Sequence, residues 1–229
     1  MNHYFSPDPL GATDRRTIEL TLPDVTLRLS TDRGVFSADR VDTGTKLLLL
    51  DGPAPTAGDR VLVDVGAGYG PIALTLAARN PDAQVWAVEV NRRARELCVD
   101  NAASNGLTNV RVVEPDEFPA DLVVDRFWSN PPIRVGKPAL HQLLDTWLVR
   151  LAPSGSAHLV VQKHLGADSL AARLTATGWR VDRRGSKKAF RLLDVRSAPP
   201  PTPPPTPHLI AATDERATTE RATTEEAEP

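Results

Sequence analysis

The stretch Asp64-Val65-Gly66-Ala67-Gly68-Tyr69-Gly70 decides the fold of this 229-residue chain. It ends the β-branched run VLVDV (61–65), which is typical of a buried parallel strand. It precedes IALTLAARN (72–80), where apolar residues recur at helical spacing. Glycines between a strand and a helix permit a tight turn and let a ligand approach the backbone at the helix N-terminus. The stretch therefore predicts a cofactor-binding loop.

The same alternation continues on both sides of this loop. Further strands are predicted at 84–90, 110–113, 122–128 and 157–162, and helices at 92–104, 139–151 and 169–177, with a turn at 153–155. The segments 179–184 and 189–195 are expected to pair as a hairpin. Upstream, residues 17–22 and 26–30 alternate around Pro23-Asp24 and predict a β-hairpin packed on the sheet. The pattern predicts an α/β fold with a doubly wound parallel sheet.

Composition divides the chain into three parts. Residues 1–50 are predicted to form an N-terminal β extension packed on the core, and residues 51–196 the main domain. Eight of the 21 prolines lie within residues 197–229, and the end of this segment is rich in Thr and Glu, so it is predicted to be a disordered tail. The tail carries six acidic and two basic residues, which leaves 25 Lys and Arg against 23 Asp and Glu in the body.

Several classes of protein are excluded by simple features. No stretch of eighteen apolar residues occurs, so no membrane association is expected. The first residues, MNHYFSPDPL, do not have the pattern of a secretory signal, and Cys98 is the only cysteine. A disulfide scaffold and a cysteine-based metal cluster are therefore excluded, no metal is expected, and a cytoplasmic location is predicted.

The spacing of the glycines and the acid before them favour one cofactor. Dinucleotide enzymes use G-x-G-x-x-G, whereas this loop reads G-x-G-x-G, which argues against a nicotinamide oxidoreductase. Asp64 would repel a pyrophosphate but suits the amino and sulfonium groups of S-adenosyl-L-methionine. Glu89, at the next strand end, can accept both ribose hydroxyls, and Asp116 is placed to meet the adenine edge. The predicted cofactor residues of this region are Asp64, Gly66, Gly68, Gly70, Glu89 and Asp116.

A second motif, Ser129-Asn130-Pro131-Pro132-Ile133, follows the strand predicted at 122–128. In an open α/β sheet, residues after the strands face the same crevice as the glycine loop. The Asn130 side-chain oxygen and the Pro131 carbonyl can accept the two N–H bonds of a planar exocyclic amine and hold its nitrogen toward a methyl donor. Positioning of this kind predicts N-methyl transfer.

Together these motifs resemble a known family, the class I S-adenosylmethionine methyltransferases of the "methyltransferase small" type. The resemblance rests on DVGAGYGPIAL (64–74), DNAASNGLTNV (100–110) and SNPPIRVGK (129–137). GVFS (34–37) and VDTGT (41–45) further resemble small-subunit ribosomal RNA guanine-N2 methyltransferases. The resemblance implies a seven-stranded methyltransferase fold and methylation of a guanine N2. It also implies that residues 36–45, including Thr45, line the cofactor pocket, and that residues 130–133 clamp the target base.

The acceptor has alternatives. An adenine N6, a protein glutamine or a small-molecule amine would use the same cofactor, and a non-catalytic RNA-binding assembly factor would retain the pocket as a relic. An RNA substrate requires a cationic surface, and the region 180–196 is rich in basic residues. The predicted RNA-binding residues are Arg183, Arg184, Lys187, Lys188 and Arg191. Ribosomal RNA or the small ribosomal subunit is the expected partner.

Overall fold

A seven-stranded sheet forms the centre of the protein in a computed structural model that describes residues 13–132, 136–187 and 189–197. The strand order is β5-β4-β3-β6-β7-β9-β8. The strands are β3 (Val61–Val65), β4 (Gln84–Val88), β5 (Val110–Val113), β6 (Val124–Ser129), β7 (Leu151–Gln162), β8 (Trp179–Lys187) and β9 (Phe190–Ser197). The strands from β5 to β7 pair in parallel, and β9 pairs antiparallel with both β7 and β8. The predicted α/β sheet and its final hairpin are confirmed.

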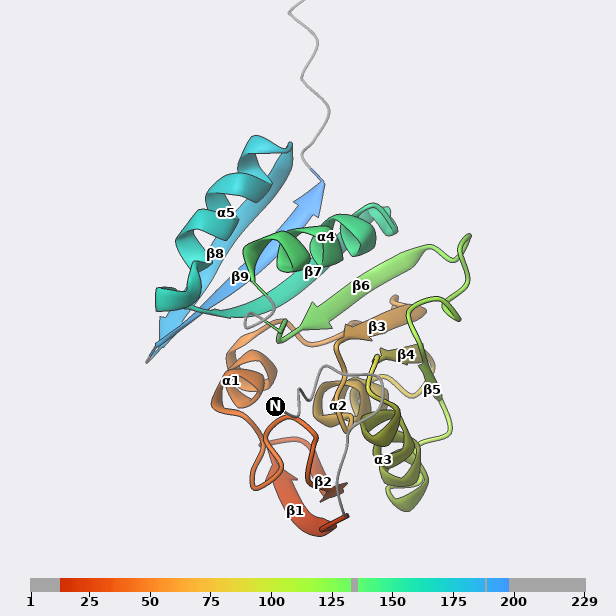
Figure 1. Ribbon diagram of the computed structural model, residues 1–229. Coiled ribbons are helices and arrows are strands. Elements are labelled where there is room, and N and C mark those ends of the chain that lie inside the picture. Colours follow the sequence, from red (N-terminus) through yellow and green to blue (C-terminus); the bar gives the residue numbers. More distant parts are fainter. Residues whose placement is uncertain (1–12, 133–135, 188, 198–229) are drawn as a thin grey trace, which may run out of the picture. The chain divides into compact units, whose positions relative to one another are not determined.

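Helices cover both faces of this sheet (Figure 1). One face carries α1 (Thr43–Asp51), α2 (Pro71–Arg79) and α3 (Arg92–Ser104), and the other carries α4 (Lys137–Leu148) and α5 (Ala167–Ala176). A short 3₁₀ helix, η2 (Lys163–Leu165), joins β7 to α5. Alternate strand residues enter the two cores, so Trp128 packs with the α1 side and Phe127 with the α4 side. Within the described ranges no helix is long and apolar enough to cross a membrane.

The N-terminal hairpin is present but lies elsewhere than expected. Strands β1 (Arg16–Thr21) and β2 (Thr26–Thr31) pair antiparallel, and β2 contacts helices α2 and α3. The prediction that the hairpin packs on the sheet is wrong, because the helices already cover that face. The Asn101 amide of α3 fixes the contact: it accepts from Ser30 N at 2.7 Å and donates to Ser30 O at 3.0 Å.

Two further features differ from the expected pattern. Residues 43–51 form α1, which the sequence analysis did not predict, and its buried leucines join the core beside Leu62 and Trp128. The expected turn at 153–155 lies inside β7, where the pairing partners shift from Val124–Leu151 to Arg126–Ser156. An irregularity of this kind tolerates Pro153, which has no N–H to contribute to the ladder.

The chain order places two loops at one point on the sheet edge. After β3, β4 and β5 the chain crosses back to form β6 on the other side of β3. The loops that follow β3 and β6 therefore lie side by side at the carboxyl ends of adjacent parallel strands. This switch in strand order is where open α/β sheets bind ligands.

Candidate active site

A cavity of about 260 Å³ occupies this edge of the sheet. Its wall comes from the glycine loop, the end of β4, the connection between β2 and α1, the segment after β6, and one side of α4. The residues that line it are Phe36, Ser37, Asp42, Thr45, Val65, Gly66, Ala67, Gly68, Tyr69, Pro71, Ile72, Val88, Glu89, Val90, Ala94, Pro115, Asn130, Pro131, Pro132, Leu143, Trp147 and Gln162. The glycine loop and the Asn130 segment therefore share one cavity.

The three glycines of the loop have different roles. Gly66 and Gly68 have φ of 78° and 59°, and a Cβ added to either would meet nothing within 4 Å. Both line the cavity, so the open space beside them is space for a ligand. Gly70 instead caps α2 with φ 98°, where a Cβ would lie 2.4 Å from Leu74 Cδ1 and 2.6 Å from Cys98 Sγ. Gly70 thus permits α2 to approach α3 and does not line the cavity.

Glu89 fixes the loop at the end of β4. Its Oε2 accepts from Gly68 N at 2.8 Å, and its Oε1 accepts from Asn91 N at 2.9 Å. Burial raises the pKa of this carboxyl, while the hydrogen bonds from Asn91 and Gly68 act in the opposite direction. Each carboxylate oxygen still has a lone pair for a further donor, such as a ribose hydroxyl.

Asp64 lies behind the wall of the cavity. Its side chain is fully buried, and Oδ2 accepts from Ala73 N at 2.9 Å. Its Oδ1 has no hydrogen-bond partner among the described residues. Burial, with a smaller contribution from the charge of Glu89, raises the pKa of Asp64 to about 8. A buried carboxyl of this kind is stabilised as the anion when a cation lies nearby.

The segment after β6 carries the predicted clamp. The Asn130 Nδ2 donates to Asp42 Oδ2 at 2.9 Å and to Thr45 Oγ1 at 3.0 Å, and all three residues line the cavity. Pro131 and Pro132 follow and also line it, while Ile133 lies outside the described residues. Neither proline has an N–H group, so their carbonyls face no competing backbone donor of their own.

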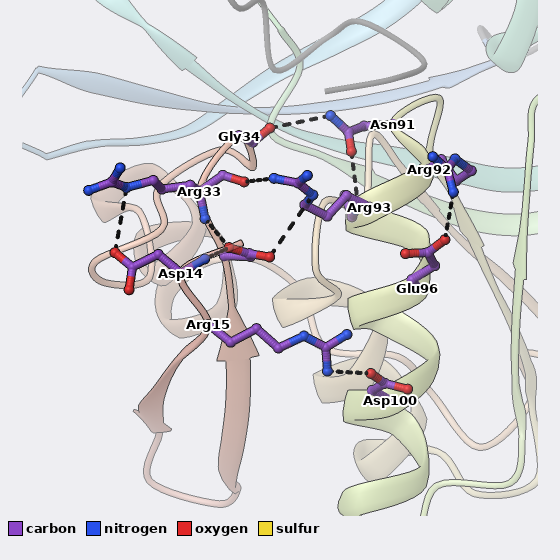
Figure 2. Close-up of polar contacts among 11 residues, drawn as sticks. Asp14, Arg15, Arg33, Gly34, Asn91, Arg92, Arg93, Glu96 and Asp100 are labelled. Atoms are coloured by element: carbon purple, nitrogen blue, oxygen red, sulfur yellow. Dashed lines mark hydrogen bonds and ion pairs between the residues drawn. The ribbon is translucent and has the colours of Figure 1, made fainter. Parts of the chain in front are cut away.

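The connection between β2 and α1 forms another wall, and Figure 2 shows how it is tied to α3. Asn91 Nδ2 donates to Gly34 O at 3.3 Å, and Arg93 Nη1 donates to Arg33 O at 2.8 Å. Ser37 has φ 56°, which is uncommon for a residue other than glycine. Such a conformation beside a cavity is typical of functional segments.

Some predicted residues lie away from the cavity. Asp116 is exposed in the turn after β5, and its neighbour Pro115 lines the cavity instead. Asp42 lies within the range 36–45 that was expected to line the pocket and does line the cavity, although sequence reasoning gave it no role of its own. Gln162 also lines the cavity and was not predicted. The pattern D-x-G-T at 42–45 could have identified Asp42 as the N-cap of a helix, because an acidic residue is common at that position.

Four of the five predicted RNA-binding residues lie on the β8–β9 hairpin at the far edge of the sheet, outside the cavity wall. Arg183 and Arg191 pair with Asp168 at 3.7 and 2.8 Å. Arg184 pairs with Asp194 at 2.7 Å and Lys187 with Asp51 at 3.6 Å, while Lys188 lies outside the described residues. No group of three or more metal-ligating side chains is found in the described part of the chain.

The sequence of the chain matches a known protein family and several named relatives. The family model named methyltransferase small domain matches residues 26–193. The uncharacterized protein YbxB of Bacillus subtilis is 34% identical over 197 residues, covering 85% of this chain and 98% of its own. Ribosomal RNA small subunit methyltransferase C of Hahella chejuensis is 35% identical over 161 residues, covering 66% of this chain and 45% of its own.

A solved structure shares the fold. The T. thermophilus 16S rRNA N2 G1207 methyltransferase, in complex with AdoMet and guanosine, superposes with a TM-score of 0.69 and 24% identity. The match covers 83% of this chain and 52% of that one. The chain therefore spans about half the length of the ribosomal RNA methyltransferases it matches and nearly all of YbxB.

Proposed function

Because the chain belongs to the methyltransferase small domain family, we propose that it is an S-adenosylmethionine-dependent N-methyltransferase whose acceptor is the exocyclic N2 of a guanine in small-subunit ribosomal RNA. The observation that carries the proposal is the cavity itself. It is lined both by a glycine loop with open space beside Gly66 and Gly68 and by Asn130. The Asn130 amide nitrogen is hydrogen-bonded to Asp42 and Thr45.

The residues on the cofactor side fit S-adenosylmethionine. Gly66 and Gly68 leave room that a Cβ would fill, and Glu89 offers carboxylate lone pairs for ribose hydroxyls. Asp64 holds a buried oxygen without a partner in the described ranges, which suits a nearby positive charge. The cofactor supplies a methyl carbon made electrophilic by a sulfonium.

The acceptor side fits a planar amine. Both hydrogens of the Asn130 amide are engaged by Asp42 and Thr45, so Oδ1 is the atom available to a ligand. With the Pro131 carbonyl it would accept the two N–H bonds of the amine and align its nitrogen. Fixed acceptors also stabilise the positive charge that develops on the nitrogen as the new bond forms. No strong base is required in this arrangement.

The choice of guanine as the acceptor base and of ribosomal RNA as the substrate is based on the names of the relatives. Several are named ribosomal RNA small subunit methyltransferase C, and the T. thermophilus neighbour is titled an N2 G1207 methyltransferase. These names describe longer proteins. An adenine N6, a protein glutamine or a small amine would fit the same acceptor chemistry and are the outcomes to be separated by experiment.

The test is transfer from methyl-labelled S-adenosylmethionine to purified small subunits, free ribosomal RNA and total cell protein. We expect label in RNA, and its loss in Asn130→Ala. Asn105→Ala is the matched control, because the Asn105 amide is hydrogen-bonded to Arg28 and Asn101 and Asn105 does not line the cavity. Label found in protein or small molecules and absent from RNA would reject the RNA substrate. Full activity in Asn130→Ala would reject the clamp.

A further inference from the structure

The side chain of Asp42 makes contacts in two directions. Its Oδ2 accepts from Gly44 N at 2.7 Å and from Thr45 N at 3.1 Å, which makes Asp42 the N-cap of α1. The same oxygen accepts from Asn130 Nδ2 at 2.9 Å, a contact between residues 88 positions apart in the chain. One carboxylate oxygen therefore joins the start of a helix to the segment that follows β6.

These contacts select one of the two orientations of the Asn130 amide. An amide nitrogen has two hydrogens, and both are engaged, one by Asp42 Oδ2 and one by Thr45 Oγ1. Rotation of the amide by 180° would lose the bond to Asp42 and bring the Asn130 oxygen against its carboxylate oxygen, whereas the Thr45 hydroxyl could turn and donate to the rotated oxygen. Loss of the charge-assisted bond to Asp42 alone disfavours the rotated form about 10- to 100-fold. The favoured form leaves Oδ1 for a ligand.

The glycine between these residues is explained by the same geometry. A Cβ on Gly44 would lie 2.8 Å from Phe190 Cε1 and 2.9 Å from Asp42 Oδ2. A side chain there would displace the carboxylate that holds Asn130. Each constrained position of the sequence 42–45 thus has a physical reason: an acceptor at Asp42, clearance at Gly44 and a second acceptor at Thr45.

We propose that Asp42 is a positioning residue, which orients the Asn130 amide so that its carbonyl oxygen faces the amine to be methylated. The inference rests on the proposed function, because it specifies how that acceptor clamp is set. Asp42 acts through Asn130 and does not itself accept a proton from the substrate. Its carboxylate charge is not essential for this role, because the oxygen of an asparagine at the same position is also an acceptor for Asn130 Nδ2.

The kinetic test compares Asp42→Ala, Asp42→Asn, Asn130→Ala and the double variant Asp42→Ala/Asn130→Ala. We expect Asp42→Ala to lower kcat about 10- to 100-fold, in proportion to the lost orientation, with the Kd for S-adenosylmethionine changed less than about twofold. Asp42→Asn should recover kcat to within about threefold of the parent enzyme. In the Asn130→Ala background, Asp42→Ala should cost less than about twofold more, because the amide it orients is gone.

A second measurement does not depend on turnover. The side-chain NH₂ of Asn130, observed by NMR in ¹⁵N-labelled protein, should exchange its hydrogens slowly in the parent protein and faster in Asp42→Ala. Thr45→Val, which keeps the shape and removes the second acceptor, should give an intermediate rate and replaces Asp42→Ala if that variant does not fold. Unfolding curves of all variants establish that they are folded at the assay temperature.

The outcomes separate the inference from the function on which it rests. Loss of activity in Asn130→Ala together with full activity in Asp42→Ala overturns the positioning role alone. Asp42→Asn as impaired as Asp42→Ala also overturns it, as do independent, multiplying losses in the double variant. Full activity in Asn130→Ala overturns the acceptor clamp and this inference with it. No methyl transfer to any amine by the parent enzyme overturns the proposed function itself.

Discussion

The two kinds of glycine in the cofactor loop lead to a sharp prediction. Gly70→Ala should damage the fold, whereas Gly68→Ala should damage cofactor binding. The Cβ of an alanine at position 70 would lie 2.4 Å from Leu74 Cδ1 and 2.6 Å from Cys98 Sγ, at φ 98°. At Gly68 the φ is 59° and nothing lies within 4 Å of the added atom. The substitutions are chemically identical and lie two residues apart.

The magnitudes follow from these distances. A left-handed alanine costs about 1–2 kcal/mol, and overpacking a dense interior adds about 1–3 kcal/mol. Gly70→Ala should therefore lower the free energy of unfolding by about 2–5 kcal/mol, and Gly68→Ala by about 1–2 kcal/mol. For a domain of this size the corresponding falls in Tm are about 4–20 °C and about 2–8 °C.

Thermal unfolding and titration calorimetry with S-adenosylmethionine measure the two effects separately. Gly68→Ala should weaken cofactor binding by about tenfold or more, because its methyl group enters the space of the ligand. Gly70→Ala, assayed well below its Tm, should bind the cofactor within a few-fold of the parent. Equal losses of stability in the two variants would refute the reasoning, as would an unchanged Kd in Gly68→Ala.

Three further predictions concern charge. The folded pKa of Asp64, about 8, exceeds its unfolded value of 3.8, so the folded chain binds more protons between these values. The free energy of unfolding should then fall as pH rises through that window, and Asp64→Asn should flatten the fall in urea titrations; an unaltered slope contradicts the assignment. Asp194→Ala leaves His158 and Arg184 without their buried partner. It should lower the free energy of unfolding, measured in urea, by about 3 kcal/mol. A loss under about 1 kcal/mol would show that the contacts of Asp194 with these two residues are dispensable. The third change neutralises Arg183, Lys187 and Arg191 on the β8–β9 hairpin. If these cations bind RNA, the slope of log affinity against log salt concentration should become less steep by about 2. An unchanged slope would show that they do not belong to the RNA interface.

The parts of the fold that could be predicted are those written in local sequence. Strand β3, the glycine loop and α2 are contiguous, and each has its own signal in β-branched residues, glycines and helical spacing. The parallel sheet was accessible from the alternation of its strands with helices. Helix α1 was not predicted, although Asp42 and Gly52 bracket it as caps, because its leucines are buried without a clear amphipathic period.

The parts that could not be predicted depend on contacts between distant segments. The position of the hairpin on α3 is set by Asn101, whose amide meets Ser30 across 71 positions. The Asp42–Asn130 contact spans 88 positions, so neither motif alone indicates it. Asp116 and its neighbour Pro115 are both exposed in the turn after β5, and of the two Pro115 lines the cavity. Local patterns cannot resolve such a choice.

Analysis of the modified nucleoside tests the central claim most directly. Small subunits and free small-subunit ribosomal RNA would be incubated with S-adenosylmethionine and either the parent enzyme or Asn130→Ala, then digested to nucleosides and examined by mass spectrometry. We expect N2-methylguanosine with the parent enzyme and none above background with Asn130→Ala. A different methylated nucleoside would contradict the guanine assignment, and equal N2-methylguanosine from both proteins would contradict the role of Asn130.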